Sequence, residues 1–344
     1  MIKDLTVEIL KHRVTMFLLV IFLLIGVIIG AFFTRVKSNI SQLFVPQFEH
    51  QNGYSGLLTN PLLDCDSYEN TGIVKLIPLK TEIESIRKSA IDSGNITEMS
   101  VYYRDLGNGS WVGVNLDKKF APASLLKVPV MIAYLKKVEK DPTLLQQTIT
   151  IKDDPGIPQL IQEIPPAHFA KVGETYTVDE LINLMITYSD NIAKYGLTQE
   201  LEQSSLDEVF VDLGLVLPQT SIEDNFMTVR EYSTFFRVLY NATYLNREMS
   251  EKALGYLTTS DFDNGLRTGI PSNTIIANKF GERSLEDEKT GEVIHQLHDC
   301  GVVYLPSNPY IACVMTRGAS FEKMTPIIGK ISKAIYEHTI ESKD

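Results

Sequence analysis

The sequence is poor in cysteine. Its 344 residues contain only Cys65, Cys300 and Cys313, too few and too odd in number for the disulfide framework of a small secreted domain. Their spacing does not resemble a zinc site, although an exported domain could pair two of them. Cys65 lies too far beyond the apolar N-terminal run to be a lipid-attachment cysteine at a signal-peptide cleavage site.

Basic residues are in the minority. The chain has 32 Lys and Arg residues against 43 Asp and Glu residues, a net charge of -11 at pH 7. No basic stripe and no internal repeat are visible. Because phosphate binding requires clustered Lys and Arg, the composition argues against a nucleic-acid partner.

One long apolar run lies near the N-terminus, where residues 14–33 include no charge over 20 positions. A helix of about 20 apolar residues can cross a membrane. A signal peptide usually has a shorter apolar core that ends in small residues, whereas Thr34 and Arg35 follow this run. A buried core helix would show a polar face, which the run lacks. We therefore expect a single transmembrane helix over 14–33.

The flanking charges indicate an orientation for this span. Three Lys and Arg residues precede the run and two follow closely, so the positive-inside bias slightly favours a cytoplasmic N-terminus. We expect residues 1–13 to form a cytoplasmic tail and the remainder to lie outside the cytoplasmic membrane.

The segment after the span changes character twice. Residues 34–76 mix polar, Pro and Gly residues without periodicity, which predicts a stalk that packs partly on the domain behind it. From Leu79, LKTEIESIRKSAIDSG predicts an amphipathic helix closed by Gly94. Residues 98–106 and 111–115 predict two strands joined by a Gly-Asn-Gly turn.

A mostly helical stretch follows over about 124–257, and then short β-rich runs over 274–277, 301–305 and 310–316 precede a final helix over 326–339. Strands at both ends of the chain around a helical insertion predict an α/β fold. We expect an antiparallel sheet flanked by N- and C-terminal helices, plus an all-α subdomain, with a cleft between the two.

Ser124-Leu125-Leu126-Lys127 begins the helical stretch. Residues three apart on a helix share a face, so the hydroxyl and the amine can touch. A hydroxyl needs a neighbour that takes its proton, and a desolvated lysine gives up its own proton more readily. The apolar run VPVMIAYL after Lys127 supplies that desolvation.

This spacing is unspecific, because Ser85 and Ser320 also precede a lysine by three positions. The motifs that follow distinguish Ser124. Ser189-Asp190-Asn191 occurs once, after the predicted helix LINLMITY; a second hydroxyl could relay a proton, and the amide could bind a substrate carbonyl. The alternative is a simple helix cap, which Ser and Asp favour.

Lys279-Phe280-Gly281 ends the predicted strand TIIAN. The lysine could hold a substrate carboxylate, and the glycine would let substrate lie along the strand edge. A backbone N–H of this strand could join that of Ser124 in stabilising a tetrahedral oxyanion. An isolated motif of this kind is usually a solvated turn.

Lys289-Thr290-Gly291 is a competing candidate for the same strand motif. The preceding ERSLEDE is too charged for a buried strand, so we interpret Lys289 as part of a long hairpin loop before His298.

Together and in this order, the three motifs resemble those of the class A β-lactamase and penicillin-binding protein superfamily. The resemblance covers about residues 79–339 and includes Phe120, Tyr188 and the strand entry 298–303. It implies the β-lactamase/transpeptidase-like fold as one catalytic domain over 77–341, without a metal or cofactor.

The resemblance also implies a role for residues of each motif. Ser124 would be the acylated nucleophile, Lys127 its proton acceptor and Ser189 the proton shuttle. Asn191 would bind the acyl amide, and Lys279 would attract the substrate carboxylate.

The oxyanion hole would comprise the backbone N–H groups of Ser124 and Glu282, with Gly281 leaving room for substrate at the strand edge. One departure from the family affects this part. Phe280 stands where the family has Thr or Ser, which removes a hydroxyl that would help bind the carboxylate.

A second departure concerns hydrolysis of the acyl-enzyme. Class A β-lactamases carry a Glu, followed within a few residues by Asn, on a long loop that activates the deacylating water. Here the corresponding connection, 215–227, is short. Its acids are Glu223 and Asp224, and Asn225 follows too closely to fit the pattern.

We therefore expect a membrane-anchored, extracytoplasmic serine hydrolase that opens β-lactams, or hydrolyses closely related amides or esters, through an acyl-enzyme on Ser124. Peptidoglycan peptides are the other expected substrate class, for a D-Ala-D-Ala carboxypeptidase or transpeptidase that deacylates slowly. A non-catalytic sensor of cell wall or β-lactam would fit Phe280 and the short loop. It would not explain why Ser124, Lys127 and Ser189 occur together, and a purely structural protein would not explain it either.

Overall fold

The computed structural model describes residues 58–60, 75–152, 162–218, 225–286, 291–306 and 308–341. The chain divides into two units, residues 1–50 and 51–344, and all described residues belong to the second. The predicted transmembrane helix over 14–33 lies outside them. Within the described ranges, no helix is both long and apolar enough to span a membrane.

The centre of the described fold is a five-stranded antiparallel sheet with the order β2-β1-β9-β8-β7. Its strands are β1 (Glu98–Asp105), β2 (Trp111–Val114), β7 (Ile275–Glu286), β8 (Val293–Tyr304) and β9 (Tyr310–Gly318). The predicted hairpin corresponds to β1 and β2. The last strand in the order, β7, is an edge strand, so one of its sides has no strand neighbour in this sheet.

The C-terminal strands are longer than the sequence predicted. Strand β7 continues to Glu286, which pairs with Val293 of β8. The sequence predicted that ERSLEDE is too charged for a buried strand but did not predict that residues 282–286 would extend β7 as a partly exposed strand. These residues are half-buried or exposed, so their charged side chains keep contact with water while the backbone pairs with β8.

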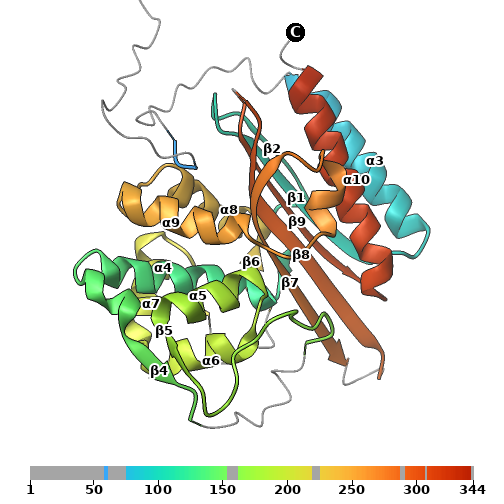
Figure 1. The fold of residues 1–344 in the computed structure, drawn as a ribbon. Coiled ribbons are helices and arrows are strands. Elements are labelled where there is room, and N and C mark those ends of the chain that lie inside the picture. Colours follow the sequence, from blue (N-terminus) through green and yellow to red (C-terminus); the bar gives the residue numbers. More distant parts are fainter. Residues whose placement is uncertain are drawn as a thin grey trace, which may run out of the picture. The chain divides into compact units, whose positions relative to one another are not determined.

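One face of the sheet is covered by the first and last helices, α3 (Ile77–Asp92) and α10 (Phe321–Glu341), which lie side by side (Figure 1). Helix α3 buries Leu79 and Ile83, as its predicted apolar stripe requires. Helix α10 begins about a turn before its predicted start, and Pro326 lies inside it. The apolar residues of α10 are buried in the core on this face, and this burial stabilises the helix although Pro326 lacks a backbone donor.

The other face carries a helical layer (Figure 1). Its helices are α4 (Lys127–Val138), α5 (Val178–Thr187), α6 (Asn191–Glu200), α7 (Gln203–Asp212), α8 (Val229–Tyr240) and α9 (Arg247–Thr258). Helix α4 buries nearly every residue because VPVMIAYL has no polar face. Helices α5 and α8 begin in capping boxes, Thr177 with Glu180 and Thr228 with Glu231.

Part of the predicted stalk packs on the domain, as expected. The Glu251 carboxylate accepts the backbone N–H groups of Leu58 at 2.8 Å and Thr59 at 2.9 Å. The Tyr304 hydroxyl donates to the Leu58 carbonyl at 2.9 Å. Residues 58–60 are therefore held by side chains of the helical layer and the sheet.

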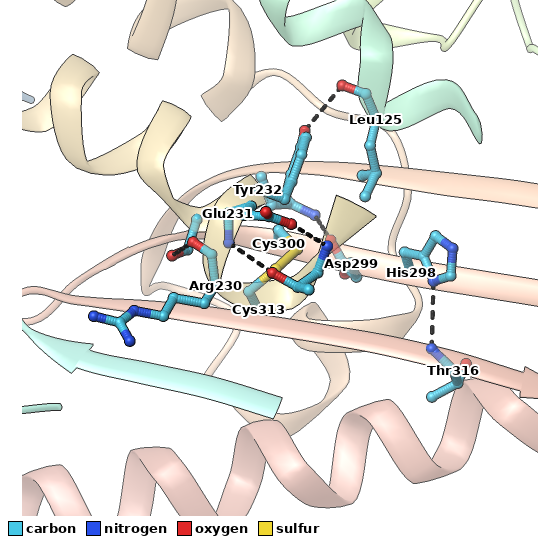
Figure 2. The surroundings of a disulfide bond; sticks show 12 residues. Leu125, Arg230, Glu231, Tyr232, His298, Asp299, Cys300, Cys313 and Thr316 are labelled. Atoms are coloured by element: carbon cyan, nitrogen blue, oxygen red, sulfur yellow. Dashed lines mark hydrogen bonds between the residues drawn. A yellow bond between two sulfur atoms is a disulfide. The ribbon is translucent and has the colours of Figure 1, made fainter. Parts of the chain in front are cut away.

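A disulfide joins Cys300 and Cys313, which face each other on β8 and β9 with Cα atoms 4.0 Å apart (Figure 2). Both residues are fully buried on the face that packs against the helical layer. Two of the three cysteines are thus paired, whereas Cys65 lies outside the described residues.

Candidate active site

Ser124 lies on a tight turn that leads into the buried helix α4. A short 3-10 helix, η1 (Ala123–Leu126), precedes α4, and Ala123 adopts a positive φ of 51°. The Tyr232 hydroxyl donates to the Leu125 carbonyl at 3.0 Å (Figure 2). His298 Nε2 lies 2.9 Å from the Ala121 carbonyl oxygen. The turn is thereby held from α8 and from β8, and it leaves Ser124 only half-buried.

The side chain of Lys127 connects the two serine motifs. Its Nζ lies 3.0 Å from Ser124 Oγ and 3.1 Å from Ser189 Oγ, and it also donates to the Ser189 carbonyl. Lys127 is 1% exposed and Ser189 is fully buried. The structure therefore brings these three predicted residues together, with the amine between the two hydroxyls.

The surroundings of Lys127 disfavour its charged form. Burial lowers the pKa of Lys127 well below its usual value, and the charges of Lys279 and Lys194 lower it further. Among the described residues, no carboxylate forms an ion pair with this amine. A lysine that loses its proton readily and touches a serine hydroxyl can act as a general base.

Ser189 occupies the junction of α5 and α6, where it has a φ of 57°. The sequence left a simple helix cap as the alternative to a catalytic role for this motif. Asp190 is that cap: its carboxylate accepts the N–H groups of Ile192 at 2.8 Å and Ala193 at 3.1 Å. The cap thus leaves the Ser189 hydroxyl available to Lys127. Asn191 is the first residue of α6, two residues after Ser189.

Gln162 is a site residue that the sequence did not reveal. Its Nε2 donates to the Ser189 carbonyl at 2.9 Å, and its Oε1 accepts the Asn191 N–H at 3.3 Å. The amide therefore fixes the left-handed turn that carries Ser189. A single Gln in a polar segment gives no sequence signal for this contact.

Strand β7 approaches the Ser124 turn at Gly281. A Cβ on residue 281 would lie 2.8 Å from the Pro122 carbonyl oxygen and 3.0 Å from the Leu125 nitrogen, so only glycine fits. The backbone of Glu282 follows directly. The Glu282 carboxylate accepts the N–H groups of Glu163 at 3.0 Å and Ile164 at 3.3 Å, which ties the Gln162 segment to the same strand.

Lys279 is fully buried on this strand, without an ion pair to any described carboxylate. Its Nζ donates to the Phe280 carbonyl at 3.0 Å and lies 4.2 Å from the centre of the Phe280 ring. Burial lowers the pKa of Lys279 to about 7, opposed by the Asp299 and Asp261 carboxylates. Phe280 itself packs in the core under α10 and stacks on Phe262, with ring centres 4.1 Å apart.

The other Ser-x-x-Lys pairs lie on the surface. Ser85 and Lys88 are exposed on α3, where Lys88 pairs with Asp92 at 2.5 Å. Lys323 is exposed at the start of α10. Their settings lack the burial that would depress the pKa of a lysine.

Two parts of the sequence interpretation fall partly outside the described residues. Lys289 and Thr290 are not described, so the competing strand motif stays untested. Glu223 and Asp224 are not described either. Asn225 is described, and its Oδ1 accepts Gln296 Nε2 at 3.0 Å and an Arg317 nitrogen at 2.7 Å.

No group of three or more potential metal ligands occurs in the described part of the chain. The polar groups that the described residues bring together here are a lysine with a lowered pKa, two hydroxyls, and a second buried lysine on the edge strand.

The chain is similar to known proteins. A family model described as the β-lactamase enzyme family matches residues 78–339. The curated β-lactamase VEB-1 of Pseudomonas aeruginosa is 23% identical over 218 residues, which cover 58% of this chain and 70% of that protein.

Solved structures show the same fold. The structure of PBP-A superposes with a TM-score of 0.63 at 23% identity, over 76% of this chain and 97% of PBP-A. A class A β-lactamase from Mycobacterium abscessus superposes with a TM-score of 0.61 at 21% identity, over 75% of this chain and 98% of that enzyme. Because the family model spans most of the chain, this protein belongs to the β-lactamase enzyme family.

Proposed function

We propose that this protein is a serine hydrolase that opens β-lactams, or hydrolyses closely related amides, through an acyl-enzyme on Ser124. The observation that carries the proposal is the position of Lys127 Nζ, 3.0 Å from Ser124 Oγ and 3.1 Å from Ser189 Oγ in a buried setting. The family membership supports the same reaction class.

In the acylation step, neutral Lys127 accepts the Ser124 hydroxyl proton while Ser124 Oγ forms a bond to the substrate carbonyl carbon. The backbone N–H groups of Ser124 and Glu282 are proposed to stabilise the tetrahedral oxyanion. Lys127 then returns the proton through the Ser189 hydroxyl to the leaving nitrogen, and the C–N bond breaks. The product is a Ser124 ester.

Substrate binding would use groups on both sides of Ser124. Asn191 is proposed to bind the acyl amide from the start of α6. Lys279 is proposed to attract the substrate carboxylate from β7, with Gly281 allowing close approach of the substrate to the strand. PBP-A supports a β-lactam ligand, because a variant of it has been solved as an acyl-enzyme with penicillin G.

A penicillin-binding carboxypeptidase or transpeptidase that deacylates slowly is the second candidate. Asn225 favours it, since the hydrogen bonds from Gln296 and Arg317 engage its side chain at the sheet. An Asn held there is not available to help a carboxylate orient a deacylating water.

We further propose that the protein is anchored in the cytoplasmic membrane by residues 14–33, with the catalytic domain outside. The Cys300–Cys313 disulfide supports this location, because disulfides form and persist in oxidising compartments. Epitope tags at the two termini, probed by protease on intact cells, would test the orientation; a protected C-terminus would refute it.

The function is tested by incubating the full-length protein with a fluorescent penicillin and following both labelling and release of label. We expect labelling that is lost in Ser124→Ala and retained in Ser85→Ala, which removes a serine of the same spacing from an exposed helix. Release within seconds would favour a β-lactamase, and release over many minutes would favour the penicillin-binding candidate. Absence of both labelling and penicillin hydrolysis in the unmodified protein would contradict both.

A further inference from the structure

A buried carboxylate lies behind the lysine-bearing part of β7. Asp299 on β8 is fully buried and pairs in register with Phe280. Its Oδ1 accepts Asn278 Nδ2 at 2.9 Å, and its Oδ2 accepts the Leu266 N–H at 2.9 Å. Asn278 directly precedes Lys279, so the carboxylate is bonded to the strand segment that carries the lysine.

The space for this carboxylate depends on a glycine. A Cβ on residue 265 would lie 2.6 Å from Asp299 Oδ2, and Gly265 has a φ of 64°, which also favours glycine. The turn is fixed on α10, because Ser332 Oγ donates to the Leu266 carbonyl at 2.7 Å. The Asp299 carboxylate therefore occupies a space that depends on the absence of a side chain at Gly265 and on the attachment of this turn to α10.

Asp299 and Lys279 are both fully buried charges, and neither forms an ion pair within 4.0 Å among the described residues. A buried charge without compensation is costly, so each is expected to depend on the field of the other. The ammonium of Lys279 lies 4.2 Å from the centre of the Phe280 ring, and Phe280 is the register partner of Asp299.

Other charged or titratable groups also act on this pair, from several elements. They are Lys127 on α4, Tyr232 on α8, Asp261 after α9, Arg267 in η4 (Gly265–Gly269) and Glu282 on β7. Of the carboxylates, Asp299 raises the pKa of Lys279 the most.

We infer that Asp299 is a positioning residue for the substrate-carboxylate site: through Asn278 it holds the strand segment that presents Lys279, and its buried negative charge favours the cationic form of that lysine. The inference rests on the proposed function. A Thr or Ser at residue 280 would help bind the substrate carboxylate with its hydroxyl. In this protein Asp299, inside the sheet, would instead support that binding through Lys279.

The titration of the two groups agrees with this role. Burial raises the pKa of the Asp299 carboxyl to about 6, so it is ionised at neutral pH. Burial lowers the pKa of Lys279 to about 7, and the Asp299 charge opposes that decrease. With this pKa about a quarter of the Lys279 amine is protonated at pH 7.5, and removing the Asp299 charge would lower the pKa and that protonated fraction further.

The test compares Asp299→Asn with the unmodified full-length protein, using penicillin G and its methyl ester, which has no carboxylate. We expect the second-order acylation rate with penicillin G to fall about fivefold to tenfold at pH 7.5 and to recover as the pH is lowered by about one unit. The rate at saturating penicillin G and the rate with the ester should change little. Equal losses with both substrates at every pH would overturn the inference.

Two further measurements keep the outcome decisive. Asp299→Asn also disturbs the hydrogen bond from the Leu266 N–H, so Asn278→Ala serves as a second variant. It removes a hydrogen bond to the ionised carboxylate and should lower the acylation rate with penicillin G in the same way, by a smaller factor. The Lys279 ¹³Cε resonance, identified by its loss in Lys279→Arg, reports the lysine directly. Its titration midpoint should fall in both variants; an unchanged midpoint would refute the inference.

The resonance also separates this inference from the proposed function. If the unmodified protein reacts with no penicillin but the midpoint still falls in Asp299→Asn, the proposed substrate is wrong and the coupling of Asp299 to Lys279 stands.

Discussion

The two sides of the candidate site differ in how completely their polar groups are partnered. On the helical side, Lys127 contacts both Ser124 and Ser189 by hydrogen bonds. On the strand side, Lys279 has only the carbonyl and ring of Phe280 as close partners in the described structure. The groups proposed to transfer protons are thus already in contact without substrate, whereas Lys279 has no described anion in contact.

Burial lowers the pKa of both lysines, but the charges around them differ. At Lys127, two other lysines lower the pKa further and carboxylates oppose them less strongly, which suits a base. At Lys279, carboxylates oppose the decrease, which favours a cation. Similar burial can therefore support two chemical roles, because the balance of neighbouring charges differs.

The largest effect is expected from removing the base on the helical side. Lys127→Met keeps an apolar side chain of similar length in the buried position, and the acylation rate with penicillin should fall about 1,000-fold because no group takes the Ser124 proton. Lys88→Ala, at the same spacing on the surface of α3, should leave the rate unchanged. Stopped-flow kinetics measures both, and a loss below tenfold for Lys127→Met would deny it the role of base.

A strong effect on stability is expected at His298, which joins the sheet to the Ser124 turn. Burial lowers the pKa of His298 to about 4 from the usual 6.5. Between these values the unfolded chain binds a proton that the folded chain does not, so stability falls as the pH falls, by about 3 kcal/mol in total.

His298→Gln should remove this dependence while its amide can still donate to Ala121. Urea unfolding of both proteins between pH 7 and pH 4 measures the difference. Asp299 has a raised pKa and contributes the opposite slope in both proteins, so subtraction isolates His298. Parallel curves for the two proteins would show that folding does not lower the pKa of His298.

The proton shuttle should account for a smaller loss of activity. Ser189→Gly removes the hydroxyl and suits the φ of 57°, so acylation should slow by about 100-fold while the fold is retained. Ser189→Ala should slow acylation equally. Its free energy of unfolding should be about 1 kcal/mol lower than that of Ser189→Gly, because a Cβ is strained at this positive φ. If the glycine variant acylates at the unmodified rate, Ser189 is no shuttle.

The smallest effect is expected from the ring on the strand side. Phe280→Leu removes the π face next to Lys279 Nζ, so the substrate concentration for half-maximal acylation should rise by about tenfold, with the saturated rate unchanged. Phe262→Leu serves as the control, because it removes the ring that stacks on Phe280 but leaves the Phe280 ring beside Lys279. A larger rise in Phe262→Leu than in Phe280→Leu would show that packing, not the cation contact, matters.

The helical side could be predicted from sequence to a greater extent than the strand side. The spacing of Ser124 and Lys127 is a local helical property, and Ser189 follows a strongly periodic helix. Gln162 could not be found, because its two contacts depend on how a polar segment folds back onto the start of α6.

The strand side depends on pairing between distant segments. The charge of residues 282–286 concealed a strand, since an edge strand can expose polar side chains while its backbone pairs with β8. The sequence allowed two cysteines to pair without showing which, and only the register of β8 and β9 brings Cys300 opposite Cys313. The burial of Phe280 under α10 was equally a property of packing.

The most direct test of the central claim is to locate the acyl group. After reaction with penicillin G, intact-protein and peptide mass spectrometry should find one penicilloyl adduct on the peptide that contains Ser124. Ser124→Ala should carry none under the same conditions, and Ser85→Ala should carry as much as the unmodified protein. An adduct that persists in Ser124→Ala, or maps to another residue, would contradict the assignment of Ser124 as the nucleophile.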